Sequence, residues 1–156
     1  MTITKTLSLR EAIVSYRKTD TLPDYMTFET FIHDAKTSIK ILRPHYGVNI
    51  DLREVFMVLM LNRRNKVLCV HLASIGGVSG TVADPKIIFQ AAILCGASGM
   101  ILSHNHPSGN NEPSESDKQL TKRFSEGGKL LDIAVLDHVI LTEEDFYSFA
   151  DNGVIF

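Results

Sequence analysis

The chain has 156 residues, 44% of them hydrophobic, and a formal net charge of −2. This length suits one globular domain with one core. The slightly acidic balance excludes the overall positive field that draws dedicated nucleic-acid binders to phosphate. No stretch approaches the roughly 20 apolar residues of a membrane-spanning helix, and the N-terminus lacks the features of a signal peptide. We therefore expect a cytoplasmic protein, with Cys69 and Cys95 reduced and buried.

The first fifty residues differ in pattern from the rest of the chain. Apolar residues recur near helical spacing over residues 24–44, and Pro44 follows the last of them. The spacing predicts one helix over this stretch, ended by the proline. We expect residues 1–50 to be an N-terminal helical segment packed on a core that residues 51–156 form.

Two strands are predicted next. "VFMVLML" (55–61) is continuously apolar, as in a strand buried on both faces. "KVLCVHL" (66–72) follows a polar turn and is its expected hairpin partner. The glycine-rich loop at 76–81 lacks a lysine at phosphate-loop spacing, which argues against nucleotide binding.

Helices and strands then alternate to the end of the chain. Asp84 and Pro85 begin a helix that Gly96 can close. A strand is expected from residue 100, followed by a helix over 114–131 that Gly127-Gly128 ends. Leu120, Phe124 and Leu130 should face inward from this helix. A strand over 132–142, a short helix or turn over 143–153 and an extended end are expected to follow. This order predicts an α/β protein with helices on both faces of a sheet.

The strand from residue 100 runs into "SHNHPSGNNEPSESD" (103–117). His104 and His106 are two residues apart, so on a strand their side chains point to the same face. Asp117 lies in the first turn of the next helix. Two imidazoles and one carboxylate can occupy three corners of a zinc tetrahedron and leave the fourth open for water, as in catalytic sites.

A purely structural interpretation competes with this one. Ser114-x-x-Asp117 can cap a helix, with the carboxylate favoured by the helix dipole. The two histidines would then be polar loop residues. That interpretation accounts for Ser114 and Asp117, but not for two histidines on one face at the end of an apolar strand.

Zinc hydrolysis also needs a general base. Glu54 directly precedes the central apolar strand and is the candidate, although a glutamate at a strand end more often only reaches solvent. Glu11 and Glu29 lie on the N-terminal segment and are poorly placed for this role.

Together these residues resemble a known metalloprotease motif. Glu54, His104-x-His106-Pro107 and Ser114-x-x-Asp117 are similar to the JAMM (MPN+) motif. The stretch "HNHPSGNNEPSESD" and the C-terminal "LLDIAVLDHVILTEEDFYSFADNGVIF" are closest to the bacterial RadC-type branch. The resemblance covers roughly residues 50–156.

The resemblance implies a three-layer α-β-α sandwich with a mixed, cytidine-deaminase-like sheet. It also implies zinc held by His104, His106 and Asp117, with Glu54 as the base and Ser114 steadying the oxyanion of the tetrahedral intermediate. Eukaryotic relatives cleave isopeptide bonds of ubiquitin, and some bacterial relatives act on ubiquitin-like sulfur carriers. A zinc-dependent hydrolase of a peptide or isopeptide bond in an unidentified protein substrate is therefore expected.

Two departures from the RadC-type pattern bear on other functions. Residues 1–50 show no glycine-rich helix-hairpin-helix, which weakens a link to DNA repair, and Lys86 stands where relatives often have Arg. A non-catalytic binding or scaffold module is the alternative from another class, but the complete set of five motif residues argues against it. A nuclease is excluded because true HNH residues are dispersed in sequence, and a nucleotide deaminase because its His-x-Glu and Pro-Cys-x-x-Cys elements are absent.

Two further histidines, His71 and His138, lie on predicted strands. We interpret both as structural residues. His138, beside Asp137, can in addition support the metal ligands from behind.

Overall fold

The structure is a computed structural model that describes residues 30–77 and 82–155. The start of the predicted N-terminal helix and residues 78–81 of the glycine-rich loop lie outside this part. The described elements, in chain order, are α1 (Ala35–Tyr46), a 3₁₀ turn (Gly47–Asn49), β1 (Val55–Leu61), β2 (Val67–Ile75), α2 (Pro85–Leu94), β3 (Gly99–Asn105), α3 (Glu115–Leu131), β4 (Ala134–Leu141) and β5 (Phe146–Ser148).

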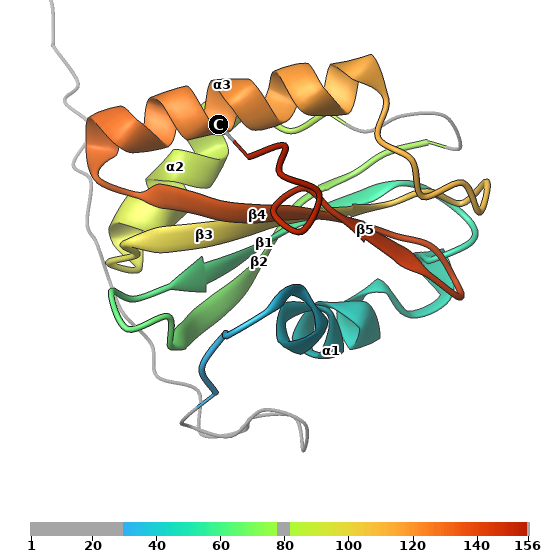
Figure 1. Ribbon diagram of the computed structural model, residues 1–156, viewed down its shortest axis with the longest axis horizontal. Helices are drawn as coiled ribbons and strands as arrows, with labels where there is room; N and C mark the ends of the chain where they lie inside the picture. Colours follow the sequence, from blue (N-terminus) through green and yellow to red (C-terminus); the bar gives the residue numbers. More distant parts are fainter. Residues whose placement is uncertain (1–29, 78–81, 156) are drawn as a thin grey trace, which may run out of the picture.

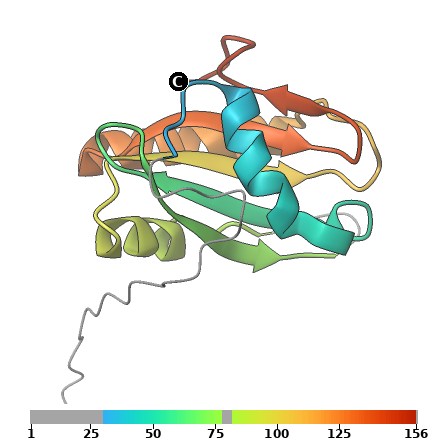
Figure 2. The ribbon, with the colours of Figure 1, turned by 90° about the horizontal axis from the view of Figure 1, so that it is seen from below.

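The strands form one open sheet in the order β2-β1-β3-β4-β5. β3 and β4 run parallel, and all other neighbours are antiparallel. Helix α1 covers one face, whereas α2 and α3 cover the other (Figures 1 and 2). This arrangement confirms the predicted three-layer α/β sandwich with a mixed sheet.

The sheet separates two hydrophobic clusters, and β1 contributes to both. All seven residues of β1 are buried. Its odd-numbered residues pack with α1, and its even-numbered residues pack with α2 and α3. The continuous apolar run that predicted a strand buried on both faces therefore has that structure.

The prediction for the N-terminal helix was wrong for residues 30–34 and for its C-terminal end. α1 begins only at Ala35, where the Asp34 side chain accepts a hydrogen bond from the Thr37 backbone N–H at 2.7 Å. Residues 30–34 precede the helix and are not helical. Pro44 lies inside the helix, which continues to Tyr46. A proline this close to the end removes one helical hydrogen bond and stops only the turn that follows.

The prediction that Gly127-Gly128 ends the second long helix was also wrong. α3 continues to Leu131 and closes at Asp132, which adopts a left-handed conformation with φ of 54°. A β-carbon at Gly128 would lie 2.2 Å from the Ile133 carbonyl oxygen. The glycine therefore permits a close backbone approach inside the helix. Leu130, predicted to face inward, is 86% exposed, whereas Phe124 is buried as predicted.

Three smaller predictions have mixed outcomes. The helix after Asp84 forms as expected, with the Asp84 carboxylate accepting from the Lys86 N–H and Gly96 at φ of 69°. Residues 143–153, predicted as a short helix or turn, form no helix: they contain β5, which pairs with β4, and turn residues at 149–153. Cys69 and Cys95 are free thiols as expected, yet both are half-buried, and the Cys95 thiol donates to the Ala92 carbonyl at 3.4 Å. No helix in the described part combines the length and apolarity that a membrane span requires.

Candidate metal centre

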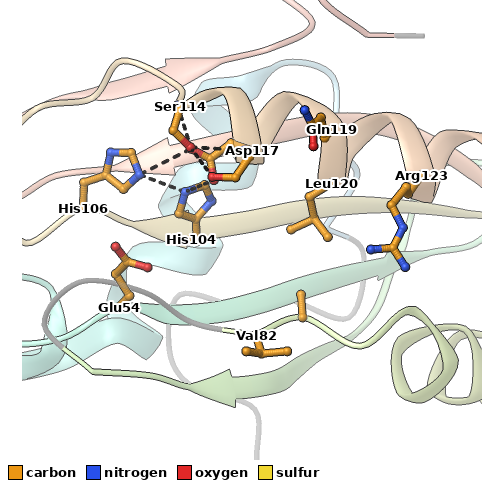
Figure 3. Close-up of a pocket in the computed structure, with 11 residues that line it drawn as sticks. Glu54, Val82, His104, His106, Ser114, Asp117, Gln119, Leu120 and Arg123 are labelled. Atoms are coloured by element: carbon orange, nitrogen blue, oxygen red, sulfur yellow. Dashed lines mark hydrogen bonds and ion pairs between the residues drawn. The ribbon is translucent and has the colours of Figure 1, made fainter.

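The two histidines of the motif leave the carboxyl end of β3 on the α2/α3 side of the sheet. His104 is the penultimate residue of the strand and is 3% exposed, and His106 follows directly after the strand. Their Nε2 atoms lie 3.0 Å apart. The strand alternation therefore brings both imidazoles to one point, as the sequence predicted (Figure 3).

Asp117 reaches the same point from the first turn of α3. Its Oδ1 atom lies 3.3 Å from His104 Nε2, and its Oδ2 atom lies 3.8 Å from His106 Nε2. Asp117 and Ser114 also form a complete capping box, in which each side chain accepts from the other's backbone N–H. The competing structural interpretation of Ser114-x-x-Asp117 is thus correct as a description of the helix start. The same cap fixes the carboxylate beside the histidines.

These three residues form the one cluster of potential metal ligands among the described His, Cys, Asp and Glu side chains, with one donor atom from each within 4.8 Å of the others. Zinc–nitrogen bonds of 2.0–2.1 Å imply about 3.3 Å between neighbouring ligand atoms of a tetrahedron. The observed separations are 3.0 Å between the two Nε2 atoms, 3.3 Å from His104 Nε2 to Asp117 Oδ1 and 3.8 Å from His106 Nε2 to Asp117 Oδ2. The residues present therefore fit zinc in their chemistry, and one donor atom from each lies close enough to the others to share one ion.

A chain of hydrogen bonds behind His104 determines which of its nitrogens carries the proton. Thr121 Oγ1 donates to the backbone carbonyl of Asp117 at 2.6 Å, so it must accept from His138 Nδ1, also at 2.6 Å. Burial holds the pKa of His138 well below its ordinary value, so this ring is neutral and its Nε2 is an acceptor. That acceptor lies 2.8 Å from His104 Nδ1. His104 therefore carries its proton on Nδ1 and presents a lone pair on Nε2.

His106 has the same tautomer for a different reason. Its Nδ1 atom lies 2.7 Å from the carbonyl oxygen of Asn110, which can only accept. The proton is therefore on Nδ1, and Nε2 again offers a lone pair.

The point where the three side chains meet is consequently rich in acceptors and poor in protons. Burial alone would raise the pKa of Asp117, whereas hydrogen bonds from the Ser114 hydroxyl and backbone N–H lower it and favour the ionised carboxylate. Two lone pairs and one negative charge thus converge without a donor between them. Such a set is complementary to a bound cation.

Aromatic rings fix the orientation of the two buried histidines. Phe56 of β1 stacks on His104 with ring centroids 5.9 Å apart and an interplanar angle of 7°. Phe149 stacks on His138 at 4.9 Å. These rings exclude water from the side of the centre opposite the solvent, and the Nε2 atoms keep their direction.

Asn105, between the two histidines, points to the other face and holds the segment that carries Glu54. Its Oδ1 atom accepts from the backbone N–H of Val55 at 2.8 Å. The two hydrogens of its amide nitrogen are shared among three carbonyl oxygens at 2.9–3.0 Å, those of Asn49, Ile50 and Arg53. The residues on either side of Glu54 are therefore tied to the strand that bears the histidines.

Glu54 itself lines the same hollow as the three candidate ligands. The hollow has a volume of about 570 Å³, and its lining includes all five residues of the motif. Backbone hydrogen bonds of Glu54 with Gly76 and Gly77 fix its main chain, and its half-buried side chain points toward the histidines (Figure 3). The structure thus brings together every residue that the sequence nominated for the site.

Three contributors were not nominated as site residues from the sequence, namely Thr121, Phe56 and Asn105. Thr121 could have been found because it follows Asp117 by four residues and so lies on the same helix face. His138, considered as one option for supporting the candidate ligands, is hydrogen-bonded to His104.

Comparisons with known proteins identify the family of the chain. The family model of the RadC-like JAB domain matches residues 32–154, and the chain belongs to this family. It is similar to a UPF0758 protein of Flavobacterium johnsoniae, with 44% identity over 124 residues, which are 79% of this chain and 53% of the relative. A UPF0758 protein of Methanosarcina acetivorans is 33% identical over 132 residues, 81% of this chain and 58% of the relative. The chain spans about half the length of the curated relatives it matches.

Proposed function

We propose that this chain is a zinc-dependent metallohydrolase that cleaves a peptide or isopeptide bond in an extended segment of a protein. The observation that carries the proposal is the convergence of two Nε2 lone pairs and an ionised carboxylate beside Glu54. Membership of a family that includes metalloproteases supports the same conclusion.

His104, His106 and Asp117 would hold the zinc ion. When bound, zinc supplies Lewis acidity, which polarises a carbonyl and lowers the pKa of water to about 7. His138 and Thr121 keep His104 in the tautomer that can act as a ligand. The capping box fixes the position of the Asp117 carboxylate at the helix start.

Glu54 is proposed as the general base and acid. A carboxylate on the rim of the hollow can take a proton from the attacking water and deliver it to the leaving nitrogen. Its fixed main chain keeps that carboxylate close to the ligands while leaving it free of them.

Ser114 is proposed to stabilise the charge that develops on the carbonyl oxygen of the scissile bond. Its hydroxyl lies on the same rim and donates to Asp117 Oδ2 at 2.5 Å. Rotation about the side chain would turn that proton toward a bound substrate. One such donor is commonly worth about 3 kcal/mol in the transition state.

The experiment that tests this function uses zinc-loaded protein and a library of extended peptides and ubiquitin-like tails. Cleavage that stops on chelation and in Glu54→Gln is the expected result. Cleavage that survives both treatments would come from a contaminant. Failure of the zinc-loaded protein to cleave any member would favour a binding or scaffold function instead.

A further inference from the structure

The hollow at the candidate metal centre extends along α3, away from the two histidines. Beyond Asp117 it is lined by Gln119, Leu120 and Arg123 of α3 and, opposite them, by Val82 and Ala83. In Figure 3 Leu120 lies between the ligands and Arg123, with Val82 across the hollow. A bound chain that leaves the metal centre in this direction would pass an apolar middle section and then reach the guanidinium group.

Arg123 has no partner within the described part of the chain. Neither an ion pair nor a hydrogen bond of its guanidinium is present among these residues. Arg43 provides the contrast, because its guanidinium donates to the carbonyls of Thr142, Glu143 and Asp145. Arg43 is therefore satisfied as part of the fold, whereas the donors of Arg123 are available to a ligand.

The charges along the hollow are divided between its two ends. Glu54 and Asp117 lie at the metal end, and Arg123 is the only Lys or Arg among the lining residues that the structure describes. Arg123 also lines a neighbouring hollow of about 410 Å³ together with Lys86, where Glu126 is the one acidic residue. The far end thus carries a net positive charge and is complementary to an anion.

The spacing along α3 sets how far that anion would be from the reacting bond. Arg123 follows Asp117 by six residues, or about 9 Å along a helix that rises about 1.5 Å per residue. An extended peptide advances about 3.3 Å per residue. Two to three residues of an extended substrate would therefore span the distance.

We propose that Arg123 is a specificity-determining residue that binds a carboxylate of the substrate, two to three residues from the scissile bond. This inference rests on the proposed function. The planar guanidinium matches a carboxylate with two parallel hydrogen bonds. Leu120 and Val82 would favour an apolar or small side chain between the carboxylate and the bond that is cleaved. The carboxylate can belong to an Asp or Glu side chain or to the C-terminus of the substrate.

The test uses short quenched fluorescent peptides of Ala and Gly in which one residue is Glu, Gln or Lys, moved through every position. A second series has its only carboxylate at the C-terminus and is compared with the C-terminal amide. The zinc-loaded chain is assayed for cleavage, and binding of the same peptides is measured by fluorescence anisotropy. Preference for Glu at one position identifies an acidic side chain, whereas preference for the free acid in the second series identifies the C-terminus.

Charge reversal makes the test specific to Arg123. Wild type should favour the carboxylate peptide over its neutral match by about three- to tenfold in KM or Kd, and Arg123→Glu should prefer the Lys peptide instead. Lys122→Glu is the matched control, because it makes the same charge change on the neighbouring exposed residue, which does not line the hollow. An equal preference in wild type and Arg123→Glu, or an equal loss in both variants, would overturn the proposal.

The outcomes separate this inference from the proposed function. Cleavage without a carboxylate preference would refute the role of Arg123 and leave the hydrolase standing. Carboxylate binding that depends on Arg123 but comes without cleavage by zinc-loaded protein would do the reverse. Neither binding preference nor cleavage would refute both.

Discussion

The two faces of the end of β3 carry polar residues with opposite hydrogen-bonding states. On the α1 face, Ser103 contacts the Tyr46 hydroxyl at 2.7 Å, and Asn105 satisfies one N–H and three carbonyls. On the α2/α3 face, His104 and His106 direct two lone pairs at each other and at a carboxylate. Every polar group of the first face has its partner within the chain, whereas the second face has acceptors in excess.

This difference separates structural from functional polar residues without reference to any relative. A buried polar group that serves the fold is paired, because an unpaired one costs about 1–3 kcal/mol. Acceptors that converge without a donor are instead stable when a ligand from outside the chain, such as a cation, binds to them. Substitutions on the two faces should therefore have different consequences.

The largest effect is expected on the α2/α3 face, which carries the candidate metal centre. Glu54→Gln should lower the rate constant for hydrolysis by about 10²–10⁴-fold, the usual contribution of a general base. Zinc content and thermal stability should stay near wild type, because Glu54 is outside the ligand set. Kinetics and metal analysis on one preparation test this, and a variant that loses its zinc would mean that Glu54 supports the metal instead.

The second largest effect is expected on the α1 face, where the polar groups are paired. Asn105→Ala should lower the free energy of unfolding by about 3 kcal/mol, because it leaves the Val55 N–H and several carbonyls without a buried partner. Ser103→Ala, on the same face, loses one contact and should cost about 1 kcal/mol. Urea denaturation of both variants measures the difference. Equal small losses would show that Asn105 does not hold the segment around Glu54.

The third effect concerns His138, which is hydrogen-bonded to His104 behind the candidate metal centre. His138→Phe keeps an aromatic ring next to Phe149 but removes the acceptor for His104 Nδ1. Zinc affinity should fall about 10–100-fold, the usual result of removing such a support. Competition with a chromophoric chelator measures the affinity. An unchanged affinity would show that the tautomer of His104 does not depend on His138.

The smallest effect is a dependence of stability on pH in the chelator-treated protein. Burial keeps His138 neutral in the folded state, whereas in the unfolded chain it takes up a proton with an ordinary pKa near 6.5. Lowering the pH below that value therefore favours unfolding, by at most about 1.4 kcal/mol per pH unit for one group. Denaturation of wild type and His138→Phe at several pH values tests this. The slope below pH 6.5 should be shallower in the variant, and identical slopes would contradict the assignment.

Much of the sheet could be predicted from the sequence, because its strands are long apolar runs bounded by turn residues. β1 is the clearest case, since seven successive apolar residues have few alternatives to a fully buried strand. Helix ends were harder to predict. Pro44 and Gly128 were both predicted to end helices. Pro44 instead lies two residues before the end of α1, and Gly128 lies inside α3 in close contact with the backbone of Ile133.

The candidate site shows a similar division. The spacing of His104 and His106 predicts their common face, because alternation along a strand is a local property. The partners behind them, His138 and Thr121, come from other elements, and only the parallel pairing of β3 with β4 and the packing of α3 bring them together. The contacts of Asn105 and the place of Arg123 in the hollow likewise depend on which residues face them across the fold.

Elemental analysis can show whether His104, His106 and Asp117 hold one zinc ion. Wild type and His104→Ala/His106→Ala should be purified in parallel, with His33→Ala/His45→Ala as a control that removes two exposed histidines elsewhere. We expect about one zinc per chain in wild type and in the control, and essentially none in the His104/His106 variant. Equal zinc in all three proteins would contradict this expectation.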